Sequence, residues 1–196
     1  MATPLTDVIR HEFNDALSSF QAMAADPAIE ATMIAAVAMC EHTLRGGRKL
    51  LFAGNGGSAA DAQHWAGELV SRFYYDRPGL PAIALTTDSS ILTAVGNDYG
   101  YEHTFSRQVQ ALGQAGDLFV ALSTSGNSPN ILRAVDAARE AGVKVIGFTG
   151  RKGGALADRC DLCFRVPADL TPRIQEGHEF LGHLLCSLIE SRMFPR

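Results

Sequence analysis

Four polar side chains on two segments of the chain could together hold a divalent cation or move protons. His64 and Glu68 are four residues apart in a stretch of helical spacing, so both project from one face of that helix. Gln175 and His183 are eight residues apart in a second helical stretch, which separates them by about 80° around the axis. Two imidazoles, a carboxylate and an amide oxygen form a mixed nitrogen and oxygen donor set that suits an ion such as zinc. Spacing alone also permits a plainer interpretation, in which each of the four is an ordinary surface or interface group.

A glycine-rich turn, Gly54-Asn55-Gly56-Gly57-Ser58, follows an apolar run and leads into a helical stretch. Glycines allow a ligand to approach the backbone closely, and the free N–H groups at a helix N-terminus point toward an anion. The turn also fits the dinucleotide pattern G-x-G-x-x-A through Gly54, Gly56 and Ala59, with Asp88 available as the acidic ribose partner. An NAD-dependent oxidoreductase is therefore one alternative for this chain.

A second loop rich in hydroxyl groups, Ser123-Thr124-Ser125-Gly126-Asn127-Ser128-Pro129, follows another apolar run and also meets a helix start. Ser128 suits the N-cap and Pro129 the first helical position. In the plainer interpretation Ser58 and Ser128 merely cap helices. Four hydroxyls exceed what capping needs, and turns at the carboxyl ends of parallel strands lie where open α/β sheets bind ligands. We therefore expect a phosphorylated ligand, whereas the dinucleotide alternative leaves this loop without a role.

The elements that must position these groups follow from the apolar pattern. Short apolar runs that alternate with helical patterns predict strands at residues 49–53, 82–85, 118–122, 143–148 and 162–166. This order predicts an α/β, doubly wound, Rossmann-like fold with a mainly parallel five-stranded sheet flanked by helices. Helical spacing at residues 4–45, with a break at Asp26-Pro27 and a stop at Gly46-Gly47, precedes the sheet, and a helix at residues 171–193 ends it. We expect one domain, 1–196, whose helical extension 1–46 packs on the core or on a neighbouring subunit.

Composition narrows the class of protein. A chain of 196 residues with 46% hydrophobic side chains can bury a core without disulfides or a structural metal. The net charge of −4 and the absence of a Lys and Arg cluster argue against nucleic acid as a partner. No signal peptide or apolar run of about 20 residues is evident, which predicts a cytoplasmic protein without a membrane partner. Cys160 and Cys163 form a single C-x-x-C, so we expect four reduced cysteines, with Cys163 pointing inward from its strand.

Five segments, in order, resemble the SIS (sugar isomerase) domain and, within it, the sedoheptulose 7-phosphate isomerase or phosphoheptose isomerase family. They are residues 53–64 (AGNGGSAADAQH), 80–88 (LPAIALTTD), 96–100 (GNDYG), 123–128 (STSGNS) and 173–176 (RIQE). The resemblance covers nearly the whole chain. It implies conversion of sedoheptulose 7-phosphate, a ketose, into the aldose D-glycero-D-manno-heptose 7-phosphate through an enediol. That reaction is the first step of bacterial heptose synthesis.

The resemblance also implies roles for individual residues. Substrate contacts fall on the two loops, two helices and one further pair: Asn55, Gly56, Gly57, Ser58, Glu68, Asn97, Asp98, Ser123, Thr124, Ser125, Ser128 and Gln175. One zinc ion per subunit is expected on His64, Glu68, Gln175 and His183. Glu68 is expected to act as the catalytic base and His183 to move protons on the substrate oxygens. A homotetramer is implied, and Pro172, which replaces an Asp of some relatives, stays outside the site.

A rival interpretation comes from a sister branch of SIS proteins that closely resembles this chain, including the Phe194-Pro195 ending. Members of that branch are non-enzymatic partners of the bacterial replication initiator DnaA. They lack the catalytic Glu and the His of the last helix. This chain keeps both as Glu68 and His183, which favours the enzyme.

Overall fold

The protein is described by a computed structural model that covers residues 3–196. Its centre is a sheet of five parallel strands in the order β2-β1-β3-β4-β5. The strands are β1 (Leu50–Ala53), β2 (Ala82–Ala84), β3 (Leu118–Leu122), β4 (Lys144–Gly150) and β5 (Leu162–Val166). All five predicted strands are confirmed, and those at 118–122 and 162–166 have the predicted bounds. The parallel, doubly wound sheet is likewise confirmed.

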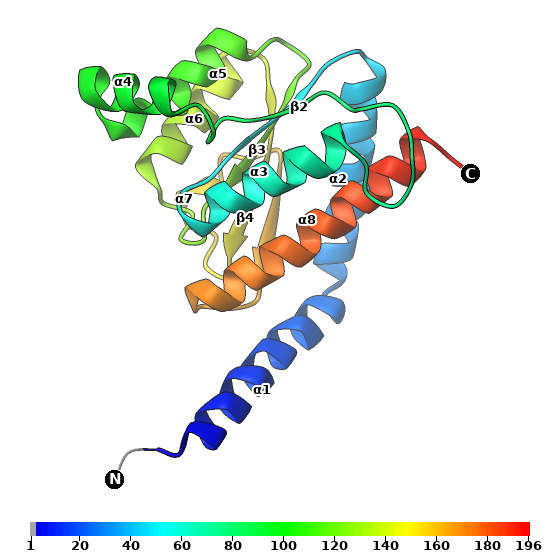
Figure 1. Cartoon of the computed structure of the whole chain (residues 1–196), viewed down its shortest axis with the longest axis vertical. Helices are drawn as coiled ribbons and strands as arrows, with labels where there is room; N and C mark the ends of the chain where they lie inside the picture. Colours follow the sequence, from blue (N-terminus) through cyan, green and yellow to red (C-terminus); the bar gives the residue numbers. More distant parts are fainter. Residues whose placement is uncertain (1–2) are drawn as a thin grey trace.

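Two helices precede the first strand, and the others lie between the strands or follow the last one (Figure 1). They are α1 (Leu5–Ala24), α2 (Pro27–Arg45), α3 (Gly57–Val70), α4 (Ser89–Tyr99), α5 (Ser106–Leu112), α6 (Pro129–Glu140), α7 (Gly154–Ala157) and α8 (Thr171–Met193), with a short 3₁₀ turn at Tyr101–His103. The predicted break is confirmed, because the Asp26 side chain accepts a hydrogen bond from Ala28 N at 2.9 Å and Pro27 opens α2. The stop is confirmed as well: α2 ends at Arg45 and Gly47 has a left-handed φ of 69°.

Alternate side chains of each strand enter two cores, one on each face of the sheet. Leu50 and Phe52 of β1 pack in the core that α2, α3 and α8 cover. Leu51 and Ala53 of the same strand pack in the opposite core, which is closed by α5, α6 and α7. Figure 1 shows α3 and α8 together on one side of the strands, while α5 and α6 lie on the other side, at the upper left of the view. Because both faces are covered, the strands read as continuous apolar runs in the sequence.

The first helix extends away from this body (Figure 1). Its C-terminal end is tied to the core through Met23, which is buried against α2 and α8. Within residues 3–196, no single helix is both long and apolar enough for a membrane span; α1 and α2 pass that test only as a pair, bent by 68° between them.

The strand order creates a switch point between β1 and β3. The connection that leaves β1 leads to β2 on one side, whereas the chain after β2 crosses to β3 on the other side. Ligands of open α/β sheets bind outside the carboxyl ends of the strands at such a point. The loops that follow β1 and β3 are the glycine turn and the hydroxyl-rich loop, so both predicted anion sites lie at this edge.

The prediction that Cys163 points inward from β5 is wrong. Phe164 and Val166 are the buried residues of this strand, while Cys163 is only half-buried and shares its face with the exposed Arg165. Side chains alternate across a strand, so Cys163 and Arg165 must lie on one face. All four cysteines are free thiols, as expected, and Cys40 and Cys186 are buried in α2 and α8.

Candidate functional site

The glycine turn packs so tightly that it requires glycine at more than one position. A Cβ on Gly54 would lie 2.6 Å from the carbonyl carbon and 2.7 Å from Cβ of Ser58. Gly56 occupies the N-cap of α3 with a φ of 58°, a left-handed conformation that side chains with a Cβ avoid. A Cβ on Gly57 would lie 2.9 Å from Cδ and 3.0 Å from Oε1 of Gln175. The start of α3 therefore faces the side chain of Gln175 from α8.

The loop after β3 forms a small cluster of hydroxyl groups. Ser123 Oγ lies 2.8 Å from Ser128 Oγ and 3.5 Å from Ser125 Oγ, and Ser125 Oγ accepts a hydrogen bond from Asn127 N. Ser128 occupies the N-cap position of α6, but its side chain makes no capping hydrogen bond. The prediction of Ser128 as an N-cap is thus right in position and wrong in chemistry, because its hydroxyl turns toward Ser123. Hydroxyls and backbone N–H groups gathered at a helix start are suited to a phosphate.

Two side chains that the sequence analysis did not assign, Asn130 and Tyr101, border this loop beside Asn55. Asn55 and the buried Asn130 exchange two amide hydrogen bonds of 2.9 and 2.8 Å, and Tyr101 donates its hydroxyl to Asn55 Oδ1 at 3.1 Å. A cavity of about 500 Å³ opens beside them, with Ser128 and Arg133 also in its wall. Asn130 and Tyr101 therefore orient Asn55 at the mouth of the glycine turn. Their contacts are non-local, which explains why no sequence pattern reveals them.

A cluster of imidazoles and carboxylates lies where α3 runs beside α8. His64 Nε2 and His183 Nε2 are 2.7 Å apart, so one ring donates an N–H to the other. Glu179 Oε1 lies 3.3 Å from His64 Nε2 and 3.0 Å from His183 Nε2, and Glu68 Oε1 lies 3.6 Å from His64 Nε2. His64 thus contacts both Glu68 and His183, as expected, but the carboxylate within 4.0 Å of the His183 imidazole is that of Glu179 and not that of Glu68. Glu179 joins them although the sequence analysis did not assign it.

Buried groups support this cluster from behind. Trp65 Nε1 donates to Glu179 Oε2 at 3.0 Å, which fixes the carboxylate between the two imidazoles. Gly182 allows the close approach of α8, since any Cβ there would overlap the Trp65 indole. Asp61, one turn before His64, has its pKa raised to about 6 by burial and by the neighbouring Glu179 carboxylate. Its buried Oδ2 has no hydrogen-bond partner among residues 3–196.

The donor atoms of this cluster fit a divalent metal ion. One ligand atom each from His64, Glu179 and His183 lies within 4.8 Å of the others. Two nitrogen ligands of a tetrahedral zinc lie about 3.3 Å apart for bonds of about 2.0 Å, so rings at 2.7 Å need to separate only slightly. Imidazole and carboxylate are both zinc ligands, and each side chain here remains partly exposed to an entering ion. The structure thus supports a metal-binding group of two imidazoles and a carboxylate.

The remaining predicted residues occupy two places. Gln175 contacts the glycine turn at Gly57 and lies on the same α8 face as Glu179 and His183, because the three are spaced by four residues. Asn97 and Asp98 lie exposed at the C-terminal end of α4, where Asn97 Nδ2 donates to Asp98 Oδ1. The dinucleotide alternative loses its acidic partner, since the Asp88 carboxylate caps α4 by accepting from Ile91 N at 2.9 Å.

Comparison with known proteins defines the class first. Residues 12–150 match the model of the SIS domain, so the chain belongs to the SIS domain family. The phosphoheptose isomerase of Aneurinibacillus thermoaerophilus is 51% identical over 190 residues, 97% of this chain and 96% of the relative. That of Burkholderia pseudomallei (strain 1710b) is 55% identical over 188 residues, 96% of this chain and 95% of the relative. Within the SIS class, the family of this chain is that of the phosphoheptose isomerases.

Solved structures agree with this membership. The structure of phosphoheptose isomerase GmhA from Neisseria gonorrhoeae aligns with a TM-score of 0.90 at 43% identity, covering 96% of this chain and all of that one. A phosphoheptose isomerase from Francisella tularensis aligns with a TM-score of 0.91 at 39% identity and covers the same shares. The fold expected from the resemblance to the SIS domain is therefore confirmed.

Proposed function

We propose that this chain is a cytoplasmic heptose-phosphate isomerase that converts sedoheptulose 7-phosphate into D-glycero-D-manno-heptose 7-phosphate. One observation carries the proposal: the side chains of His64 and Glu68 on α3 cluster with those of Glu179 and His183 on α8. The helix α3 begins at the glycine turn. Proton donors and acceptors thus lie on the same helix pair as an anion-binding turn. The non-enzymatic SIS branch lacks the equivalents of Glu68 and His183, and both are part of the cluster here.

The spacing between the two ends of the site suits a seven-carbon sugar phosphate. Gly57 and His64 are seven residues apart on α3, a rise of about 10 Å along the helix. An extended seven-carbon chain spans about 8 Å with C–C bonds of about 1.5 Å. A phosphate held by the glycine turn and the hydroxyls of Ser123, Ser125 and Ser128 would leave the carbonyl end of the sugar near the imidazoles.

Substrate binding would use both loops and one adjoining side chain. Backbone N–H groups of Gly56 and Gly57 and the hydroxyls of the second loop supply donors for an anion. The expected contacts comprise Asn55, Gly56, Gly57, Ser58, Ser123, Thr124, Ser125, Ser128 and Gln175. Ser58 is buried at the start of α3, so its part is to shape the turn. Asn97 and Asp98, exposed on α4, would reach a sugar held by this copy or by a second copy of the chain.

Proton transfer falls to Glu68 and His183. In an aldose-ketose isomerisation a base removes a proton from the carbon beside the carbonyl, and the enediol is reprotonated on the neighbouring carbon. Glu68 is the partly exposed carboxylate of the cluster on α3 and takes the role of base. His183 Nε2 lies 2.7 Å from His64 Nε2, and its partly exposed imidazole takes the role of passing protons between the substrate oxygens.

Zinc is the metal that we propose for this site, held either by the set that the resemblance implies, His64, Glu68, Gln175 and His183, or by a set in which Glu179 takes the place of Glu68. When bound, such an ion would polarise the substrate carbonyl and stabilise negative charge on its oxygen. Glu179 is the better placed of the two alternatives, because its Oε1 contacts both imidazoles. A carboxylate that ligates the ion is a weaker base, so a ligand set that uses Glu179 leaves Glu68 free for the proton.

A homotetramer is the assembly that we propose. The outward face of α1 carries Leu5, Ile9, Phe13 and Leu17, all more than half exposed. Beside this helix lies an apolar groove of about 540 Å³ between α1, α2 and α8, with Phe20, Met33, Phe180 and Leu184 in its wall. Large exposed apolar patches of this kind mark interfaces. Helix packing between copies would cover both.

The test is to incubate the purified protein with sedoheptulose 7-phosphate, with and without a chelator, and to follow the aldose product. We expect conversion that the chelator abolishes and added zinc restores. Full activity in the presence of the chelator would show that the reaction does not need zinc. Titration with purified DnaA separates the rival, since binding without any isomerisation would favour the non-enzymatic interpretation.

A further inference from the structure

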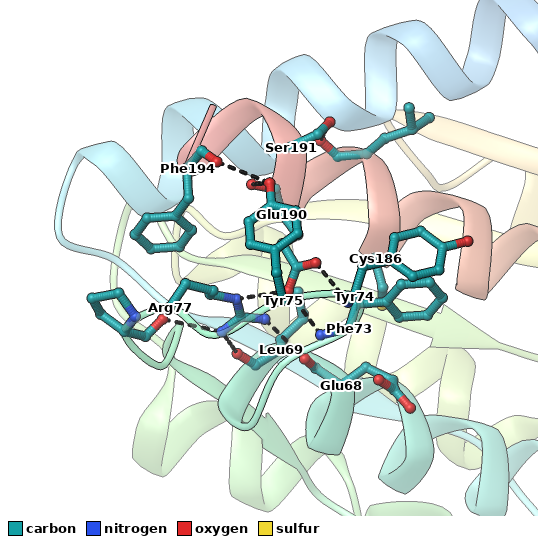
Figure 2. A network of polar contacts seen from close by, with 12 residues as sticks. Glu68, Leu69, Phe73, Tyr74, Tyr75, Arg77, Cys186, Glu190, Ser191 and Phe194 are labelled. Carbon is teal, nitrogen blue, oxygen red and sulfur yellow. Dashed lines mark hydrogen bonds and ion pairs between the residues drawn. The ribbon is translucent and has the colours of Figure 1, made fainter. Parts of the chain in front are cut away.

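A buried ion pair joins α8 to the segment that follows α3. Glu190 on α8 is fully buried, and its carboxylate accepts hydrogen bonds from Phe73 N, Tyr74 N and Arg77 Nε at 2.7, 2.7 and 3.0 Å. Burial alone would raise the pKa of Glu190, but the backbone N–H groups and the guanidinium outweigh it and hold that pKa below its usual range. The Arg77 side chain is only 2% exposed. Both charges are therefore paired away from water (Figure 2).

The guanidinium of Arg77 also closes the end of α3. It donates from Nη2 to Glu68 O at 2.9 Å and from Nη1 to Leu69 O at 2.6 Å. Carbonyls in the last turn of a helix have no partner within the helix, and a cation placed there interacts favourably with the helix dipole. Figure 2 shows the guanidinium lying between the Glu190 carboxylate and these two carbonyls. Arg77 thus holds the backbone carbonyl of Glu68, the residue whose side chain is the expected base.

The same carboxylate reaches the other half of the site through Phe73. With its backbone N–H bound to Glu190, Phe73 places its ring edge-on to the His183 imidazole, with centroids 5.6 Å apart at 61°. Glu190 and His183 are two turns apart on α8 and so lie on one side of that helix. The buried Glu190 carboxylate therefore holds the end of α3 through Arg77 and also holds Phe73, which lies beside the His183 ring.

We infer that Arg77, Glu190 and Phe73 are positioning residues of the isomerase site, which set the Glu68 backbone and the His183 ring relative to each other. The inference rests on the proposed function and deepens it. A buried pair of charges is often no more stabilising than apolar side chains of the same size. The planar guanidinium of Arg77 donates to two carbonyls at once and so fixes their direction, which an apolar side chain cannot do. Groups that orient metal ligands or catalytic side chains typically change metal affinity or activity about 10- to 100-fold when altered.

The experiment compares Arg77→Lys with Tyr75→Phe as a matched control. Lysine keeps a positive charge opposite Glu190 but cannot reach both carbonyls with a rigid fork. The Tyr75 hydroxyl belongs to the same network yet donates to Phe194 O and Glu190 O, on the side away from α3. For each variant kcat, KM, zinc affinity by calorimetric titration and the thermal midpoint are measured. We expect Arg77→Lys to lower kcat and zinc affinity about 10- to 100-fold with little change in KM, whose determinants are the phosphate loops.

The control is expected to match wild-type kcat and zinc affinity even where its thermal midpoint falls. A purely structural role would instead lower the midpoint of both variants and leave kcat and zinc affinity of the folded protein unchanged, which would overturn the inference. If Arg77→Lys does not fold, Phe73→Leu decides, because it keeps the backbone bond to Glu190 and removes only the ring beside His183. Wild-type zinc affinity in Phe73→Leu would then refute the inference. Absence of turnover in the wild type would refute the proposed function instead, while the zinc titrations would still judge the positioning role.

Discussion

Replacing Gly57 by alanine places a methyl group against the side chain that joins α8 to the glycine turn. Gly57 is the first helical residue of α3 and its φ is not positive, so alanine can adopt the same backbone conformation without strain. The new Cβ would lie 2.9 Å from Cδ and 3.0 Å from Oε1 of Gln175, with Nε2 closer still. Ordinary contacts between such atoms are about 3.5 to 4.0 Å. Gln175 must therefore move by roughly 1 Å or change rotamer.

The expected cost falls on activity rather than on stability. A displacement of about 1 Å in a positioned group can reduce turnover about 100-fold. Alanine gains up to about 1 kcal/mol over glycine within a helix, which offsets part of the steric cost of moving Gln175. We thus expect Gly57→Ala to lose about 100-fold in kcat/KM for sedoheptulose 7-phosphate, with a thermal midpoint within a few degrees of wild type.

Gly67→Ala in the same helix is the control. A Cβ at Gly67 meets no atom of residues 3–196 within 4 Å, so only the helix propensity changes. We expect it to keep wild-type activity and to raise the thermal midpoint by about 2 to 4 °C. The reasoning is refuted if Gly57→Ala retains full kcat/KM, because the contact of the turn with Gln175 would then have no part in the reaction. A loss of activity in Gly67→Ala equal to that in Gly57→Ala would refute it too.

Three further predictions follow from single side chains. Burial lowers the pKa of His178 to about 4 despite its hydrogen bond to Thr149 O. Between pH 6.5 and 4 the unfolded chain therefore binds more protons than the folded chain. The free energy of unfolding is expected to fall by about 3 kcal/mol as the pH drops through that window. Thermal melts of metal-free His178→Gln should lack this slope, and an unchanged slope would contradict the assignment. Glu179→Gln should weaken zinc binding about 10- to 100-fold in a calorimetric titration, whereas unaltered affinity would remove Glu179 from the metal site. Phe13→Asp should lower the mass measured by sedimentation, because it charges the exposed apolar face of α1; an unchanged mass would exclude that face as an interface.

Local chemistry made most of the fold predictable. Continuous apolar runs revealed strands buried on both faces, and the five strands lie within two residues of their predicted bounds. The Asp26-Pro27 break was equally accessible, because the cap and the fixed φ of proline act on neighbouring residues. The error at Cys163 came from parity: Asp161, Cys163 and Arg165 alternate onto one face, and the apolar Phe164 and Val166 mark the other.

The site was predictable only as far as spacing and resemblance reach. His64 and His183 meet as expected and Glu68 contacts His64, but the place of Glu179 between the two imidazoles depends on how α8 lies against α3 at Gly182 and Trp65. The spacing of four residues between Glu179 and His183 was the available signal. The pair of Arg77 and Glu190 had none, since 113 residues separate two charges that local patterns treat as solvated. Contacts between distant segments are thus the part that the sequence alone did not reveal.

The most direct test of the account is the rate of aldose formation from sedoheptulose 7-phosphate by wild type, Glu68→Gln and His183→Asn. Glutamine keeps the size of Glu68 and removes its basicity, so the account predicts a loss of about 100- to 10,000-fold in kcat with a normal thermal melt. His183→Asn should lose activity on a similar scale, because the His183 imidazole contacts both Glu179 and His64. No conversion by the wild type, or undiminished conversion by both variants, would contradict the claim that α3 and α8 bring one proton-transfer centre together.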